Sequence, residues 1–192
     1  MSISLRNITK RFGKKTVIEN LSLDFESDSR TAIVAFSGSG KTTLFRIMAG
    51  LEKRFEGEVI HDGKLALMFQ EDRLFEKATV LENVTAVSDK PKEEAVKLLT
   101  ELGLGDSLHL FPTALSGGMK RRVALARALF FDAQNVLLDE CFTGLDDDTK
   151  KQTAEVINKY TQGKTLILIT HSREEARLLN CRLLIFEKGF IF

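Results

Sequence analysis

The sequence of 192 residues predicts an α/β fold: a largely parallel sheet around a phosphate-binding loop, with an antiparallel β-subdomain and an inserted helical subdomain. Three observations predict it. An apolar strand-sized segment runs directly into the glycine-rich residues 37–43, which open a helix. Two further apolar segments, 135–138 and 165–170, have the composition of buried parallel strands. Residues 71–115 show helical periodicity and paired charges, and we place the helical subdomain at roughly 71–130.

Length and composition set the first limits on function. The chain is long enough to bury one full core, so we expect a single domain over residues 1–192 that includes the helical subdomain. Its 28 basic and 27 acidic residues nearly cancel, which argues against nucleic acid as a partner. The apolar runs are strand-sized, and Cys141 and Cys181 are too isolated for a disulfide framework or a zinc site. We therefore expect a soluble protein that reaches a membrane only through partners.

Two N-terminal segments, 3–8 and 17–25, alternate apolar and polar residues and predict strands of a half-exposed antiparallel sheet. Residues 11–15 predict the turn between these strands. Phe12 in this turn has two interpretations, which the residues alone leave open. Its ring either packs like most of the other phenylalanines or stacks on an adenine base.

A phosphate-binding loop follows the strand predicted over residues 31–36 and leads into a helix that reaches Met48. Strand, glycine loop and helix are the context that such a loop needs, because glycines let backbone N–H groups face the phosphates. Lys41 would reach the outer phosphates, and the Thr42 hydroxyl would bind Mg²⁺. Ala35 replaces the first glycine of the strict pattern, and the broader pattern accepts alanine there. The residues expected to hold the nucleotide here are Ser37, Gly38, Ser39, Gly40, Lys41, Thr42 and Thr43.

Residues 58–60 and 65–69 predict the two strands of a hairpin. Asp62-Gly63 between them is a dipeptide typical of type I′ turns. The second strand ends at Gln70, and a glutamine at a strand end is usually just solvated.

The helical subdomain has one amphipathic helix and one strongly charged face. Pro91 is placed to start the amphipathic helix. A later helix carries Lys120-Arg121-Arg122, and Arg127 continues that face. We interpret this face as solvated rather than as a nucleic-acid patch. The apolar stripe of the amphipathic helix consists of Ala95, Leu98, Leu99 and Leu102.

Two motifs in the middle of the chain suit an anion and a metal ion. Ser116 lies where a helix N-cap belongs, with Gly117 and Gly118 in the first turn. Glycine weakens a helix start, and close approach of a ligand to the backbone is the usual reason to tolerate it. The acids Asp139 and Glu140 end a buried strand, where two carboxylates suit Mg²⁺ and a polarised water.

The C-terminal third continues the α/β pattern. His171 lies at the carboxyl end of a strand, and Ser172 and Glu175 predict a capping box for the next helix. Because the carboxyl ends of parallel strands meet at one edge, His171 and Glu140 should project to the edge that carries the phosphate loop. The elements predicted here are a helix over 147–161, ended by Gly163, and strands over 165–170 and 182–187.

These motifs, in this order, resemble the nucleotide-binding domain of ABC transporters, and the resemblance covers essentially the whole chain. It rests on the phosphate loop, LSGGM followed by RxxxARAL, LLDE, GLD and the strand-end histidine. The resemblance implies the ABC ATPase form of the P-loop NTPase fold, with ATP and Mg²⁺ as cofactors. The segment EDRLFEKATVLENV is most similar to the importer branch for nitrate, sulfonate and taurine.

The resemblance implies how the nucleotide and the metal would be held. Phe12 would stack on adenine, and residues 37–43 would wrap the phosphates, with Lys41 on the β and γ groups. The implied Mg²⁺ ligands are Thr42, Gln70 and Asp139.

The resemblance also implies a site shared between two subunits. Ser116, Gly117 and Gly118 would contact the γ-phosphate bound by the opposite subunit of a head-to-tail dimer. Asp146 would lie at the interface of that dimer. The implied catalytic residues are Glu140 as general base, Gln70, Lys41, and His171 as the switch residue on the γ-phosphate.

Three residues depart from the family pattern. Besides Ala35, Met119 replaces a common glutamine, and Cys141 stands where a proline commonly follows the acidic pair. Segments 57–70 and 85–92 are also shorter than usual. None of these departures removes an implied catalytic group, so we predict an active ATPase.

The leading hypothesis is therefore an ATP-hydrolysing subunit that powers transport by separate membrane-spanning permease subunits, with residues 71–80 facing them. Its other partners would be a second ATPase subunit, the same chain or a different one, and an extracytoplasmic substrate-binding protein. The chain would lie in the cytoplasm on the inner face of the membrane. A non-transport or regulatory ABC ATPase with low turnover is the alternative, which Ala35 and Cys141 keep open.

Overall fold

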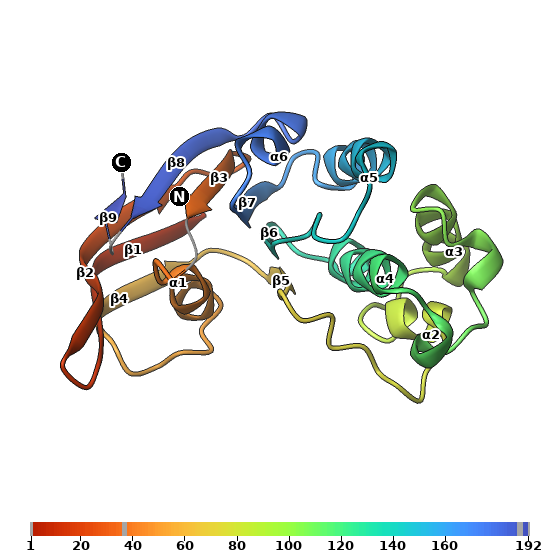
Figure 1. The fold of residues 1–192 in the computed structure, drawn as a ribbon, viewed down its shortest axis with the longest axis horizontal. Helices are drawn as coiled ribbons and strands as arrows, with labels where there is room; N and C mark the ends of the chain where they lie inside the picture. Colours follow the sequence, from red (N-terminus) through yellow and green to blue (C-terminus); the bar gives the residue numbers. More distant parts are fainter. Residues whose placement is uncertain (1, 36–37, 188–189, 192) are drawn as a thin grey trace.

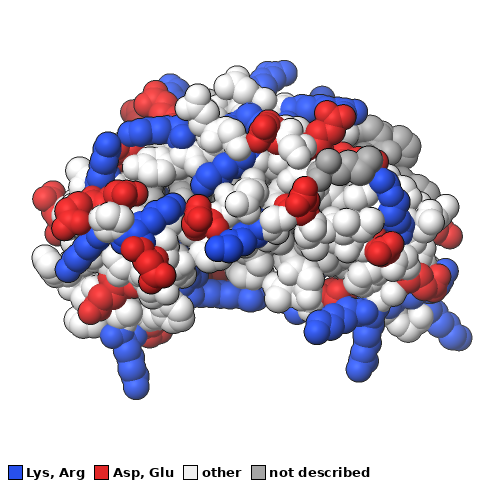
Figure 2. Space-filling model, turned by 180° about the vertical axis from the view of Figure 1, so that it is seen from behind, with Lys and Arg blue, Asp and Glu red and all other residues white. Residues whose placement is uncertain are grey.

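Two β-sheets and a group of helices make up the fold in the computed structural model, which describes residues 2–35, 38–187 and 190–191. In Figure 1 the antiparallel sheet and α1 (Lys41–Met48) lie on one side of the molecule. Helices α2 (Val80–Thr85), α3 (Lys92–Glu101) and α4 (Gly117–Phe130) lie on the other side. Figure 2 shows acidic and basic side chains interspersed over the rear face, as the near-equal charge counts lead one to expect. Among the described residues, none of the helices combines the length and the apolar character needed to cross a membrane.

The first sheet is antiparallel, with strand order β2-β1-β4. Its strands are β1 (Ile3–Phe12), β2 (Lys15–Phe25) and β4 (Glu56–His61). The predicted antiparallel pairing of the first two strands is confirmed. Both strands are longer than predicted, so that the turn shrinks to Gly13 and Lys14.

The second sheet has six strands in the order β5-β6-β7-β3-β8-β9. The first five are parallel, and β9 pairs antiparallel with β8. Every residue of β6 and β7 is buried, which explains their continuous apolar runs. The strands are β3 (Arg30–Ala35), β5 (Leu65–Met68), β6 (Asn135–Asp139), β7 (Thr165–Thr170), β8 (Arg182–Glu187) and β9 (Phe190–Ile191).

The hairpin predicted around Asp62-Gly63 is wrong. Strand β4 pairs with β1 in the antiparallel sheet, whereas β5 pairs with β6 in the parallel sheet. The connection is held by distant residues: the Asn135 side-chain amide donates to the Asp62 carbonyl at 2.7 Å, and the Gln134 side chain accepts from the Lys64 N–H at 2.7 Å. The segment therefore carries the chain from one sheet to the other.

The helices after β5 form one apolar cluster with the parallel sheet, whereas α1 belongs to a second cluster that includes the antiparallel sheet. The predicted stripe of the helix after Pro91 is confirmed, since all four of its residues are buried. The short helix α2 begins with a capping box between Thr79 and Glu82, which was not among the predicted helix starts. The helices are α1 (Lys41–Met48), α2 (Val80–Thr85), α3 (Lys92–Glu101), α4 (Gly117–Phe130), α5 (Asp147–Tyr160) and α6 (Arg173–Leu178), with short 3₁₀ turns at Gly105–Ser107 and Pro112–Ala114.

Candidate active site

The candidate site lies where the carboxyl ends of three neighbouring strands meet. Strands β6, β7 and β3 are adjacent and parallel, so Asp139, Thr170 and Ala35 end at the same edge of the sheet. The backbone N–H of Glu140 still donates to the Ile169 carbonyl at 2.9 Å, which fixes the exit of β6 beside β7. The predicted common edge for these strand ends is confirmed.

The phosphate loop turns sharply between β3 and α1. Gly38 and Gly40 have φ values of 78° and 99°, a region that favours glycine. A Cβ atom at Gly40 would come within 2.6 Å of Val17 Cγ1, so a larger residue does not fit there. The Ser39 Oγ is buried without a hydrogen-bond partner. The loop and the N-terminus of α1 therefore form a polar cradle suited to an anion, although Ser37 lies outside the described residues.

Glu140 is the centre of the site. Its Oε1 lies 2.5 Å from the Lys41 Nζ, and its Oε2 lies 2.8 Å from the His171 Nδ1. The Glu140 side chain is only 4% exposed, whereas the His171 side chain is 63% exposed. The structure thus brings together three predicted catalytic residues that come from the phosphate loop, β6 and β7.

The backbone of Glu140 is itself unusual. Its φ of 53° lies in the left-handed region, which residues other than glycine adopt at a cost of about 1–3 kcal/mol. This conformation turns the chain sharply after Asp139. The strain is therefore stored at the residue that Lys41 and His171 contact.

Asp139 is a buried acid beside this cluster. Burial first, and then the neighbouring Glu140 carboxylate, raise the pKa of Asp139 to about 6. Its Oδ1 is buried and has no hydrogen-bond partner. An unsatisfied carboxylate oxygen is a group that a hard cation would satisfy. Among the described residues, however, no three histidine, cysteine or acidic side chains lie together as a metal-binding group.

The other predicted metal ligands differ in position. Thr42 lies in the first turn of α1, next to Lys41, and Thr43 follows it in the same helix. Gln70 is exposed just after β5, the edge strand that pairs with β6. Both predicted ligands therefore lie at the carboxyl-end edge of the sheet, where an Asp139 ligand would also be found.

Phe12 lies at the end of β1, and its ring is 52% exposed. The Lys10 Nζ lies 4.5 Å from the ring centroid and also 3.1 Å from Glu52 Oε1. Simple packing in the core is therefore not the role of Phe12. The neighbouring strand β2 carries Val17, which touches the phosphate loop at Gly40, so this hairpin lies beside the loop.

The Ser-Gly-Gly helix start lies on another part of the molecule from the phosphate loop. Ser116 caps α4 as predicted, because its Oγ accepts from the Met119 N–H at 3.2 Å. A Cβ atom at Gly117 would meet only open space, and one at Gly118 would contact the Gly144 carbonyl at 3.4 Å. Helix α4 lies among the helices on the far side from α1 (Figure 1). Asp146 caps α5 by accepting from the Thr149 N–H at 3.0 Å.

The interpretation of the arginines on α4 as a solvated face is wrong. Arg121 is buried; it forms an ion pair of 3.0 Å with Asp72 and donates to the Phe69 carbonyl at 3.1 Å. Arg127 donates to the carbonyls of Asp72 and Arg73 at 3.1 and 2.9 Å. Burial lowers the pKa of Arg127, which agrees with its desolvated position. These side chains hold the segment around Gln70, a role that the charged run in the sequence did not indicate.

The three departures from the family pattern fit into the fold without displacing a polar group of the site. Ala35 is buried at the end of β3, and Met119 packs against the apolar cluster of the helices. Cys141 is fully buried directly after Glu140, and burial raises the pKa of its thiol well above the usual range.

Comparisons with known proteins agree with this geometry. The sequence pattern of the ABC transporter family matches residues 18–143. The aliphatic sulfonates import ATP-binding protein SsuB of Yersinia pestis is 40% identical, over 98% of this chain and 74% of the relative. The SsuB protein of Bacillus anthracis is 39% identical, over 96% of this chain and 81% of the relative.

Solved structures show the same architecture. A dimeric post-hydrolysis state of the ATP-binding cassette MJ0796, bound to ADP and Pi, superposes with a TM-score of 0.86 at 28% identity. The superposition covers 97% of this chain and 95% of that one. A second dimeric structure of the same bacterial cassette gives the same values.

Proposed function

Since this chain belongs to the ABC transporter family and is the ATP-hydrolysing subunit of an importer, we propose that Glu140 is its general base, with Lys41 and His171 as its catalytic partners. The observation that carries the proposal is the contact of one buried carboxylate with both the Lys41 ammonium and the His171 imidazole. This contact supports the proposal, because the carboxylate of the proposed base lies directly beside the lysine of the phosphate loop.

In this proposal two anions compete for Lys41: the Glu140 carboxylate and the phosphates of ATP. The phosphates of ATP, seated on the N–H groups of the loop and of α1, attract the Lys41 ammonium away from Glu140. The freed Glu140 carboxylate accepts a proton from the attacking water, while His171 holds its other oxygen. Lys41 then lies where negative charge develops on the transferred phosphoryl group.

The residues present fit a magnesium ion. Asp139 offers a buried carboxylate oxygen without a partner, and we propose that it binds the ion with the Thr42 hydroxyl and the Gln70 side chain. Bound Mg²⁺ would neutralise charge on the phosphates. The segment that carries Gln70 is held by Arg121, so the position of Gln70 depends on α4.

We propose that the complete site forms in a head-to-tail dimer with a second ATPase subunit. The Ser116-Gly117-Gly118 helix start would contact the phosphates bound by the opposite subunit, with Asp146 at the interface. Support comes from the position of α4, away from α1, and from the dimeric cassettes that this chain resembles. Phe12, with its exposed ring beside the phosphate loop, would stack on the adenine.

The exposed apolar side chains suggest where permease subunits bind. Phe75, Leu110 and Phe111 are all exposed, and the backbone joins their segments where the Val80 N–H donates to the Leu110 carbonyl at 2.9 Å. We propose that this patch and residues 71–80 contact membrane-spanning permease subunits, which hold the chain on the cytoplasmic face of the membrane. By similarity to the SsuB relatives, the cargo would be an aliphatic sulfonate. We also propose that an extracytoplasmic substrate-binding protein delivers the cargo. The same relatives favour an importer over a non-transport ATPase.

The test compares Mg-ATP turnover and oligomeric state in the wild type and Glu140→Gln. The variant should lose at least about a hundredfold in kcat and should form a dimer that ATP stabilises, measured by light scattering. Glu155→Gln, which changes an exposed acid on α5, is the matched control and should behave like the wild type. Full turnover in Glu140→Gln would exclude Glu140 as the base.

A further inference from the structure

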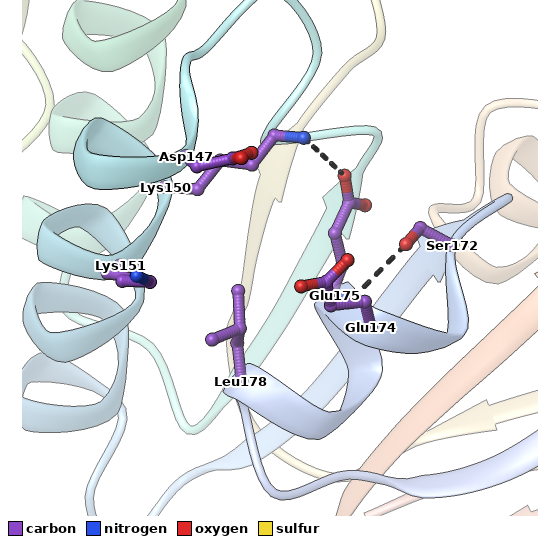
Figure 3. A pocket seen from close by; sticks show the side chains of 7 residues that line it. All are labelled: Asp147, Lys150, Lys151, Ser172, Glu174, Glu175 and Leu178. Atoms are coloured by element: carbon purple, nitrogen blue, oxygen red, sulfur yellow. Dashed lines mark hydrogen bonds and ion pairs between the residues drawn. The ribbon is translucent and has the colours of Figure 1, made fainter.

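A pocket between the first turns of α5 and α6 contains a buried acid that the proposed reaction does not use. Glu175 is only 5% exposed, although it lies near the start of a short helix. Figure 3 shows its carboxylate pointing across the pocket toward Lys150 of α5, whose Nζ lies 4.0 Å from Glu175 Oε1. The neighbouring Glu174 lines the same pocket but is exposed.

Glu175 forms hydrogen bonds with the residues on both sides of His171 in the sequence. The Thr170 hydroxyl donates to Glu175 Oε2, and the same hydroxyl accepts from the Ser172 N–H at 3.0 Å. The Ser172 hydroxyl in turn accepts from the Glu175 N–H at 3.4 Å. Thr170, directly before His171, thus binds the buried carboxylate, whereas Ser172, directly after His171, binds the Thr170 hydroxyl and the Glu175 backbone N–H.

The direction of these bonds explains what a carboxylate contributes at this position. A hydroxyl carries a single proton, and the Thr170 oxygen already accepts from a backbone N–H. Its O–H must therefore point to an acceptor, and a carboxylate is an acceptor only. The predicted capping box is half correct: Ser172 caps α6, but the Glu175 carboxylate binds the Thr170 hydroxyl.

We infer that Thr170 and Glu175 are positioning residues for His171: the buried Thr170–Glu175 bond fixes the end of β7 so that the imidazole meets the Glu140 carboxylate. The His171 side chain is itself 63% exposed, so little packing holds it in place. Its position depends on the backbone at residues 170–172, which the Glu175 hydrogen bonds fix. This inference rests on the proposed catalytic role of His171.

The first test uses Thr170→Val, which keeps the shape of the side chain and removes the hydroxyl. In the full-length chain, kcat should fall between about tenfold and a hundredfold, because a small displacement of a catalytic group has effects of this size. KM for ATP should change less than about twofold. Thr170→Ser restores the hydroxyl and should recover most of the activity, whereas failure of this rescue would overturn the inference.

A double substitution separates positioning from general stability. If Thr170 acts through His171, then Thr170→Val combined with His171→Ala should be no slower than His171→Ala alone. A further loss in the double variant, or wild-type kcat in Thr170→Val, would overturn the inference. Wild-type kcat in His171→Ala would instead contradict the proposed function.

A measurement that does not depend on turnover tests the position of His171 directly. The chain has three histidines, so the imidazole signals in NMR spectra can be assigned by the loss of one signal in His171→Ala. Thr170→Val should shift the His171 signal and leave those of His61 and His109 in place. An unchanged His171 signal would overturn the inference whatever the turnover.

The acid itself is tested with a matched pair of substitutions. Glu175→Met removes the acceptor at similar volume and should reproduce both effects of Thr170→Val. Glu174→Met changes the exposed neighbour in the same pocket and should leave kcat and the His171 signal unchanged. Should Glu175→Met fail to fold, Thr170→Val carries the test alone.

Discussion

The Lys41 ammonium lies 2.5 Å from the Glu140 carboxylate, so the proposed phosphate-binding cation and the proposed base neutralise each other. Both side chains are largely removed from solvent. Any anion that binds Lys41 must therefore break a short, desolvated ion pair. Breaking this pair also frees the Glu140 carboxylate, the proposed base. In the proposed reaction, one side chain would thus couple binding of the nucleotide to activation of the base.

Lys41→Met should lower the free energy of unfolding by about 3 kcal/mol, because it leaves the buried Glu140 charge without its closest cation. Combining it with Glu140→Gln removes that charge and should recover part of the loss. Urea denaturation measures both variants. The control is Lys159→Met, which breaks an exposed ion pair with Glu101 and should change stability far less. Equal losses of stability in Lys41→Met and Lys159→Met would contradict the prediction.

Asp139 should make the protein less stable as the pH rises from about 4 to about 6. In the unfolded chain its pKa has the ordinary value of 3.8, whereas in the folded chain burial raises it to about 6. Between these values the folded protein holds a proton that the unfolded chain has released. At about 1.4 kcal/mol per pH unit, the loss over this window is about 3 kcal/mol.

Asp139→Asn cannot release this proton and should lack the decline. Urea denaturation at several pH values, with a chelator and without nucleotide, measures the difference from the wild type. Asp132→Asn, which changes an exposed acid just before β6, should keep the wild-type slope. Parallel curves for Asp139→Asn and the wild type would show that the prediction is wrong.

Arg121→Met should loosen the segment that carries Gln70. The substitution removes the ion pair with Asp72 and the hydrogen bond to the Phe69 carbonyl, and should cost about 2 kcal/mol. Amide hydrogen exchange should become faster over residues 69–73. The control is Lys120→Met on the same helix turn, which should leave that exchange unchanged. Unaltered protection in Arg121→Met would mean that other contacts hold the segment.

Phe12→Ala should raise KM for ATP about tenfold and leave kcat nearly unchanged, since loss of one base-stacking contact has an effect of this size. Phe75→Ala is a matched control, because both rings are 52% exposed. Phe12→Trp introduces the sole tryptophan of the chain, so its fluorescence should respond to ATP. If both alanine variants bind ATP equally well, Phe12 does not stack on the base.

Features set by local pattern could be predicted from the sequence. The buried strands β6 and β7, the phosphate-loop context and the Ser116 cap each depend on neighbours within a few residues. The common edge for Glu140 and His171 also followed, because parallel strands bring their carboxyl ends together.

Features that depend on distant partners could not be predicted. A turn dipeptide at Asp62-Gly63 says nothing about which sheet receives the next strand, and its partner Asn135 lies 73 residues along the chain. The arginines of α4 look solvated in a charged run, because the carbonyls that they bind belong to a loop more than 50 residues earlier.

Chemical labelling of Cys141 would report local opening of the chain beside Glu140. Its thiol is fully buried directly beside Glu140, and burial keeps it protonated far above neutral pH. A thiol reagent can therefore modify Cys141 only after the end of β6 opens. By comparison, Cys181 lies just before β8 and is only partly buried. The rate at which Cys141 is labelled would measure how fast the end of β6 opens, without any added probe.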